Sequence, residues 1–227
     1  MEPIDKDYYM PAEWHPHECC WMQWPYENPH HNGYGAIPSW SHFDFEKGRL
    51  AWANVAKSIA EFEKVKMLVH TDNIKNAKDL LDSKIEIIEM KIDDCWARDS
   101  GAIFLLDNKN NLGGVDWEFN GWGKFKPYES DNKIAKFMIE NSNASYFKNN
   151  MVLEGGSIHV DGEGTLLTTE QCLLNKNRNP NLSKKEIEKN LKNYLGVSKI
   201  IWLKHGTDEG TDGHVDNIAC FVNSGTV

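Results

Sequence analysis

The chain has 227 residues, of which 40% are hydrophobic and 26% are charged, and its formal net charge is −9. This length and composition predict a globular protein with a large core and exclude an intrinsically disordered one. The acidic charge argues against a nucleic-acid partner, since a phosphate backbone attracts clustered Lys and Arg. It permits a cationic substrate, although many acidic proteins gain only solubility from their charge.

The apolar runs and the first residues predict a protein that neither spans a membrane nor is secreted. Runs such as 103–106 and 199–203 are strand-sized, far short of the roughly 20 residues of a membrane helix. The polar segment 1–7 lacks the basic and apolar regions of a signal peptide, so we expect a cytoplasmic protein. The odd number of cysteines, without framework spacing, predicts free thiols at Cys19, Cys20, Cys95, Cys172 and Cys220.

Helices and strands are expected to alternate after an aromatic-rich opening segment, residues 8–45, whose turns look irregular. The tryptophans of this segment are Trp14, Trp21, Trp24 and Trp40. Asp44 is placed to cap a helix over about 46–62, whose apolar residues recur at helical spacing. The next elements are a strand at 65–69, a helix at about 73–81 and a strand at 85–89 that runs into an acidic motif. That motif, residues 93–101, is therefore expected in a loop at the end of a strand.

The second half of the chain continues the same alternation. The expected elements are strands at about 102–106 and 113–119, a helix at about 131–141, short strands near 151, 157 and 165, a helix at 183–195 and a strand at 198–203. Ser183, with Glu186 three residues on, has the pattern of a capping box. No low-complexity linker divides the chain, so residues 1–227 are predicted to form one α/β domain.

A weak internal similarity links two glycine-led segments. Residues 156–161 and 212–216 both contain Gly followed by His-Val-Asp, and each is predicted to be a loop that runs into a strand. Repeated units of strands and a helix suggest radial stacking, although one shared tripeptide also arises easily by chance.

Three acid-bearing motifs suggest a site for a guanidinium group. They contain Asp99, Glu154, and His214 with Asp216. A guanidinium is planar and rich in N–H donors, so paired carboxylates can hold it by bidentate hydrogen bonds, which leaves its central carbon open to attack. A histidine kept protonated by a nearby acid can protonate a departing amine and then activate water. Trp96 is placed to offer an apolar or cation–π wall to an alkylguanidine.

Each of these residues also has a plain structural explanation. Arg98 and Asp99 can form an ion pair at a strand end, Glu154 can be a solvated acid in a tight turn, and His214 can be a core histidine bonded to backbone. Trp96 can be core packing. Only the combination of the motifs, in order, favours a guanidine-modifying enzyme.

The motif series resembles the agmatine deiminases, relatives of bacterial peptidylarginine deiminase in the guanidine-modifying (pentein) superfamily. The resemblance rests on Met10–Trp14, Trp21–Pro25, Asp94–Asp99, Trp117–Gly123, Glu154–Gly156, Leu167–Glu170, Cys172–Pro180 and Thr211–Asn217. It implies an α/β propeller of repeated ββαβ-like units and the conversion of agmatine and water to N-carbamoylputrescine and ammonia, with no metal or organic cofactor. It also implies that Asp99 and Asp216 grip the guanidinium, His214 is acid and base, Glu154 supports the site and Trp96 lines it.

The resemblance further implies a nucleophile that this chain does not contain. In the family a cysteine of a Gly-rich, His-Cys motif near the C-terminus forms a covalent amidino intermediate. We therefore expect a C-terminally truncated propeller, with its last blade or blades missing, that is inactive alone. Cys220 is expected to be a buried, inert thiol in a strand. The run 15–20 contains His and Cys, but its crowded spacing and the lack of a second ligand pair disfavour a metal site.

Two other functions stay open. The same chemistry on protein-bound arginine would make the chain a peptidylarginine deiminase, although the absence of a secretion signal disfavours this. A guanidine-binding module or an inactive remnant is the second alternative. Whether the chain forms a homo-oligomer stays open, because the sequence shows no interface.

Overall fold

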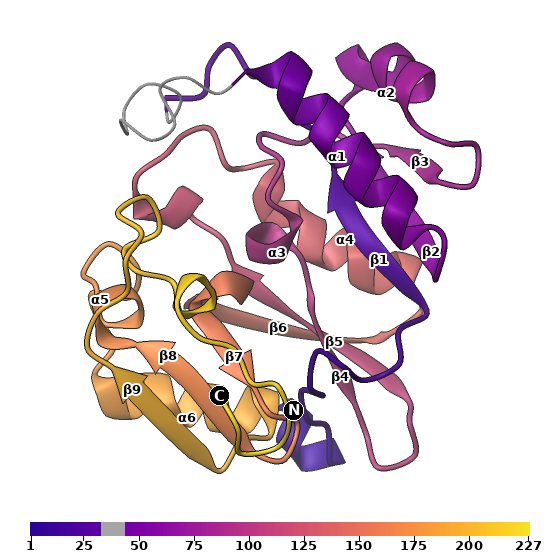
Figure 1. Cartoon of the computed structure of the whole chain (residues 1–227). Helices are drawn as coiled ribbons and strands as arrows, with labels where there is room; N and C mark the ends of the chain where they lie inside the picture. Colours follow the sequence, from indigo (N-terminus) through magenta and orange to yellow (C-terminus); the bar gives the residue numbers. More distant parts are fainter. Residues whose placement is uncertain (33–43) are drawn as a thin grey trace. The chain divides into compact units, whose positions relative to one another are not determined.

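The computed structural model describes residues 1–32 and 44–227 (Figure 1). Trp40 and part of the predicted opening segment lie outside these residues. The contacts divide the chain into two compact units, which we call the first unit and the second unit. The first unit comprises 1–15, 98–124 and 132–227, and the second comprises 16–97 and 125–131.

The second unit is built on a three-stranded parallel sheet. Its order is β1 (Cys19–Gln23), β2 (Lys64–Val69) and β3 (Glu86–Glu89). The helices α1 (Phe45–Ile59) and α2 (Ile74–Leu80) connect these strands, as parallel pairing requires a crossover between neighbours. The alternate side chains Val65, Met67 and Val69 of β2 are buried in a core with alanines of both helices.

The first unit contains two three-stranded sheets of the same topology. One consists of β4 (Ile103–Leu106), β5 (Leu112–Glu118) and β6 (Ser145–Val152), and the other of β7 (Ile158–Val160), β8 (Thr165–Thr169) and β9 (Lys199–Leu203). In each sheet an antiparallel hairpin is followed by a parallel strand. The crossovers contain α4 (Ile134–Asn141) in the first case, and α5 (Glu170–Leu173) and α6 (Lys184–Leu195) in the second.

One hydrophobic core joins these two sheets to α6. Leu105 and Val115 come from the first sheet, Leu166 from the second, and Ile187 and Leu191 from the buried face of α6. The repeated ββαβ order agrees with the predicted units, and the α/β class is confirmed. The radial arrangement of a propeller and the single-domain organisation stay predictions.

Most predicted elements are confirmed within a few residues, and both predicted caps form. Asp44 accepts a hydrogen bond from Lys47 N at 3.1 Å at the start of α1. Ser183 and Glu186 form the capping box at the start of α6, which ends at Leu195 with Gly196 as its C-cap. The predicted helix at 131–141 begins as a 3-10 turn, Asp131–Lys133, and continues as α4.

Four predictions of local structure are wrong. The opening segment contains the regular strand β1, which pairs with β2. The acidic motif does not end in a loop, because Ala97–Ser100 forms the short helix α3. Residues after His214 form a 3-10 helix, Val215–Asn217, and no strand. Cys220 lies outside any strand and is exposed.

The remaining short 3-10 helices are Pro3–Lys6, Thr71–Asn73, Gly121–Gly123 and Gly155–Ser157. Two of them, at 121–123 and 155–157, lie next to the predicted site residues. Within the described parts of the chain, no helix has the length and apolar character that a bilayer crossing requires.

Candidate active site

Three of the predicted site residues meet around one glycine of the first unit. A Cβ atom built on Gly156 would lie 2.5 Å from His214 Nδ1, 2.7 Å from Asp216 Oδ2 and 2.8 Å from Asp99 Oδ1. Such distances are below any van der Waals contact, so only glycine leaves these three side chains their positions. Asp99 comes from α3, Gly156 from the 3-10 helix after Glu154, and Asp216 from the 3-10 helix after His214.

Asp99 is a buried carboxylate with both oxygens bonded. Trp122 Nε1 donates to Oδ2 at 2.9 Å, and the backbone N–H of Gly156 donates to Oδ1 at 3.0 Å. Neither donor carries a full charge, so these two hydrogen bonds orient the Asp99 carboxylate without neutralising it. The expected ion pair with Arg98 does not form, because Arg98 pairs with Glu13 Oε1 at 2.5 Å.

His214 lies between two acids. Its Nδ1 is 3.8 Å from Asp99 Oδ1, and its Nε2 is 3.8 Å from Glu154 Oε2. Burial alone would lower the pKa of His214, but Asp99, Cys172 and Glu154 raise it to about 11. The ring is therefore an imidazolium at neutral pH, which is the form that can donate a proton. The alternative of a core histidine bonded to backbone is wrong, because its ring nitrogens face carboxylates.

Glu154 is fully buried, so the alternative that it is a solvated acid in a tight turn is wrong. Its Oε1 accepts from Arg178 Nε at 2.6 Å, while Oε2 faces His214 and forms no hydrogen bond with the described residues. Burial would raise the pKa of Glu154, but Arg178 and His214 outweigh it and lower the pKa. Glu154 therefore stays an anion that holds the His214 ring.

Arg178 is a buried residue of the site that sequence reasoning missed. Besides Glu154, it donates from Nη1 to Asp212 Oδ2 at 2.8 Å and from Nη2 to the Thr211 carbonyl at 3.1 Å. It therefore fixes both the acid and the loop that carries His214. The run 172–180 signalled the family, but a buried arginine has no local sequence pattern that separates it from an exposed one.

The loop before His214 has an unusual backbone. Asp212 and Gly213 both have positive φ, 59° and 80°. Gly213 adopts this conformation without cost, whereas Asp212 is a non-glycine residue held there by Arg178, Lys124 and Asn177. The two residues reverse the chain so that His214 turns into the site.

Asp216 is the exposed acid of the group. Partial desolvation of the Asp216 carboxyl group raises its pKa. The charge of His214 opposes this rise, and the charge of Asp99 adds to it. Two acids that approach the same point repel one another unless a cation lies between them. Asp99 and Asp216 therefore form a site whose electrostatics favour a bound cation, and a planar guanidinium suits two such acids.

Trp96 belongs to the second unit, where its ring packs edge-on against Trp52 with centroids 5.8 Å apart. Its role as a substrate wall stays a prediction. His159, the counterpart of His214 in the similar segment 156–161, lies in β7 with its Nε2 3.2 Å from Glu13. Hydrogen bonding from His159, together with Arg98, lowers the pKa of Glu13 to about 2 despite burial. His159 thus forms a structural contact with Glu13.

Cys172 is a second residue that sequence reasoning missed at the site. Candidate ligand atoms of Cys172, Glu154 and His214 all lie within 4.8 Å of one another. Arg178 and the protonated His214 disfavour a metal cation there. The thiol is fully buried, and burial raises its pKa, so it has neither the exposure nor the thiolate character of a nucleophile.

Comparisons with known proteins identify the family of the chain. A family model described as Porphyromonas-type peptidyl-arginine deiminase matches residues 9–227. The agmatine deiminase of Pseudomonas aeruginosa (strain LESB58) is 47% identical over an alignment of 233 positions, which covers 99% of this chain and 61% of that protein.

Two solved structures have the same fold over nearly the whole chain. The agmatine deiminase of Enterococcus faecalis, catalysing its reaction, has a TM-score of 0.89 at 38% identity. The match covers 99% of this chain and 60% of the Enterococcus faecalis chain. A substrate-bound agmatine deiminase of C. jejuni has a TM-score of 0.80 at 32% identity and covers 96% of this chain and 62% of its own. The chain thus spans about three-fifths of the length of the relatives it matches.

Proposed function

The chain belongs to the Porphyromonas-type peptidyl-arginine deiminase family, and we propose that it carries the guanidinium-binding and proton-transfer residues of an agmatine deiminase. The overall reaction would convert agmatine and water to N-carbamoylputrescine and ammonia. The single observation that carries the proposal is the convergence of Asp99, Asp216 and His214 on Gly156. Two acids and an imidazolium around one glycine suit a planar cation that must be protonated as it breaks up.

Asp99 and Asp216 bind the guanidinium in this proposal. Asp99 already has both oxygens oriented, by Trp122 and Gly156, so it would bind the cation with little reorganisation. A bound cation would favour the anionic form of Asp216, whose pKa its surroundings raise. Trp96 lining the alkyl part of the substrate is a further part of the proposal.

His214 transfers the protons. In the first half of the reaction a thiolate would attack the guanidinium carbon, and His214 would give its proton to the departing ammonia. In the second half it would take a proton from water, whose oxygen attacks the amidino carbon and releases the thiolate. Glu154 would keep the ring oriented and favour its protonated form. The thiolate itself is implied by the family resemblance, and the burial of Cys172 disfavours that thiol for the role.

Titration calorimetry of agmatine with the purified chain tests the binding part. We expect binding in the wild type and about a hundredfold or greater loss in Asp99→Asn and Asp216→Asn, because each variant removes one charge-assisted contact. Glu163→Gln, which removes an exposed acid of the same unit, should bind normally. No heat with the folded wild type would refute the proposal and support an inactive remnant.

Substrate class is tested in parallel by comparing agmatine with an arginine held in a short peptide. The curated relative described above is named for agmatine, so we expect agmatine to bind more tightly. Tighter binding of the peptide would favour a peptidylarginine deiminase. Ammonia and N-carbamoylputrescine, measured in the same samples, report whether the chain turns agmatine over or only binds it.

We also propose that the two ββαβ units of the first unit are blades of a propeller and that residues 1–227 act as one domain. The repeated topology of the two sheets supports this. A cytoplasmic location, the absence of a cofactor and homo-oligomer formation stay predictions.

A further inference from the structure

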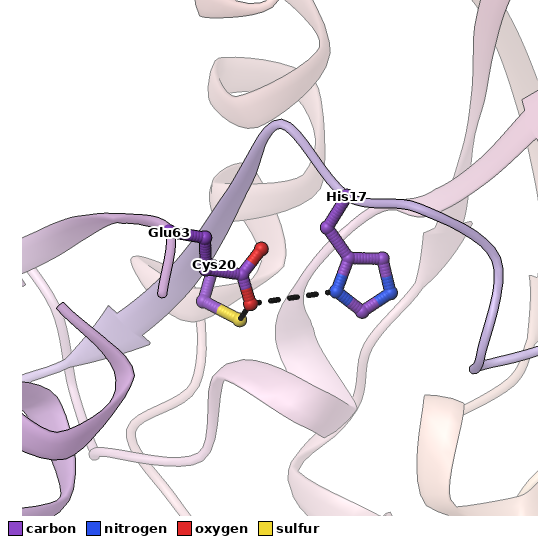
Figure 2. Close-up of side chains that lie close together, drawn as sticks. All are labelled: His17, Cys20 and Glu63. Carbon is purple, nitrogen blue, oxygen red and sulfur yellow. Dashed lines mark hydrogen bonds and ion pairs between the residues drawn. The ribbon is translucent and has the colours of Figure 1, made fainter. Parts of the chain in front are cut away.

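A second cluster of reactive side chains lies in the second unit, apart from the acids of the proposed site. His17 lies two residues before β1, Cys20 is the second residue of β1, and Glu63 directly precedes β2 (Figure 2). The two strands are parallel and pair Cys20 with Val65, so their first residues lie at the same end of the sheet. This pairing brings Glu63 to a histidine and a cysteine more than forty residues earlier in the chain.

The three side chains point at a common centre. Glu63 Oε1 is 3.5 Å from His17 Nδ1 and 3.0 Å from Cys20 Sγ, and all three candidate ligand atoms lie within 4.8 Å of one another. Ligands at ordinary zinc bond lengths in a tetrahedron are separated by about 3.3 to 3.5 Å. The observed spacing therefore needs only small side-chain movements to surround one ion.

The donor set selects a class of metal. One imidazole nitrogen, one sulfur and one carboxylate oxygen suit a borderline divalent ion such as Zn²⁺, whereas Mg²⁺ and Ca²⁺ prefer oxygen ligands alone. A thiolate and a carboxylate together balance the charge of the ion. The sequence analysis disfavoured a metal at residues 15–20 because it found no further ligand. The structure supplies one in Glu63, which comes from a different part of the chain.

The cluster is accessible without being fully exposed. The His17 side chain is 47% exposed and that of Glu63 is 21% exposed. An ion can therefore enter from solvent and keep at least one water as a further ligand, as sites with three protein ligands do.

We propose that His17, Cys20 and Glu63 form a binding site for a zinc-like divalent ion. On binding, the Cys20 thiol releases its proton to solvent, and its sulfur, His17 Nδ1 and Glu63 Oε1 bond to the ion together with water. The ion links the start of β1 to the start of β2 and stabilises the edge of the parallel sheet. This proposal does not depend on guanidine chemistry in the first unit.

Cobalt substitution tests the site directly. The full 227-residue chain, freed of metal with a chelator, is titrated with Co²⁺ and then with competing Zn²⁺. We expect one equivalent of Co²⁺ to give a sulfur-to-cobalt charge-transfer band and visible bands of four-coordinate geometry, both removed by Zn²⁺. Cys20→Ser should abolish the charge-transfer band, and His17→Gln and Glu63→Gln should weaken binding by about tenfold or more.

Matched variants separate the site from non-specific binding. Cys19→Ser removes the neighbouring thiol on the opposite face of β1, Glu61→Gln a nearby exposed acid, and Cys220→Ser an exposed thiol of the first unit. Each should leave the spectrum and stoichiometry unchanged. A charge-transfer band that survives Cys20→Ser, or one lost in Cys19→Ser or Cys220→Ser, would overturn the proposal.

A stability measurement covers the case of a variant that folds poorly. In the wild type, Zn²⁺ should raise the melting temperature in a concentration-dependent way, since an ion that binds only the folded state stabilises it. The rise should disappear in Glu63→Gln and persist in Glu61→Gln. An unchanged melting temperature in the wild type at saturating Zn²⁺, without a cobalt spectrum, would refute the site whatever the outcome with agmatine.

Discussion

Arg178 Nε donates to Glu154 Oε1 at 2.6 Å, and both side chains have no exposed surface. Because the pair is removed from water, each charge depends on the other for compensation. The same guanidinium also bonds the Thr211 carbonyl and Asp212, which precede His214. One ion pair thus connects the acid beside the imidazole to the loop that carries it.

The pair predicts a strongly non-additive effect on stability. Arg178→Met should lower the free energy of unfolding by about 3 to 5 kcal/mol, because it removes the cation that is hydrogen-bonded to a buried carboxylate. The double variant Arg178→Met with Glu154→Gln should recover part of this loss. Urea unfolding of the wild type, both single variants and the double variant measures the coupling. Additive losses would show that the two residues act independently.

His214 predicts a specific pH dependence of stability. The pKa of its ring is about 11 in the folded chain and about 6.5 when unfolded, so the folded state binds the extra proton between these values. This contribution is complete below about pH 6.5 and is lost as the pH rises toward 11. The free energy of unfolding should fall between pH 6.5 and 8.5 by at most about 1.4 kcal/mol per pH unit more in the wild type than in His214→Asn. His205→Asn, at an exposed histidine of the same unit, should keep the wild-type slope.

Asp216 predicts that agmatine binding strengthens with pH in the acid range. Its pKa is raised above the usual aspartate value, so part of the population is protonated in mild acid and must release a proton to accept a cation. Affinity should rise with pH through the acid range above the ordinary aspartate pKa and then level off, and Asp216→Asn should bind weakly with little dependence on pH. Calorimetry in buffers of different ionisation enthalpy would detect the released proton. An equally steep rise in Asp216→Asn would assign the proton to another group.

Gly156 predicts loss of binding with little loss of structure. Gly156→Ala would place a methyl group against His214, Asp216 and Asp99, which must move apart. Agmatine affinity should fall by at least about tenfold, since a misplaced charged contact loses much of its energy. Gly225 has open space around it and a positive φ that asparagine tolerates, so Gly225→Asn is the control and should bind as the wild type does. Normal affinity in Gly156→Ala would show that the three side chains do not share one ligand.

Local signals in the sequence were sufficient for much of the fold. The caps at Asp44 and Ser183 depend on hydrogen bonds within three residues, so the residue types alone indicate them. Strand β1 was missed because its evidence is the parallel pairing with β2, more than forty residues away. The similarity between residues 156–161 and 212–216 predicts a strand after His214, whereas the left-handed turn at Asp212 and Gly213 leads that segment into a 3-10 helix.

The sequence predicted the acids and the histidine of the candidate site but not the residues that hold them in place. Asp99, Glu154, His214 and Asp216 could be named because their chemistry suits a guanidinium. The roles of Arg178 and Trp122 depend on which polar groups become buried next to those acids, and burial follows from contacts between distant segments. The prediction that Cys220 is buried failed for the same reason, since it assumed a strand that does not form.

The link from Glu13 to both Arg98 and His159 has a consequence for how the chain folds. Arg98 is next to Asp99 in the chain. The contacts of Glu13 with Arg98 and His159 therefore hold the segment before residue 16 beside the acids. Contacts between such distant segments form late, because the entropy of closing long loops opposes them until the surrounding core is in place. We therefore expect the acid cluster to become ordered only near the end of folding. A protein fused directly before Met1 would slow that last step more than it would disturb the finished structure.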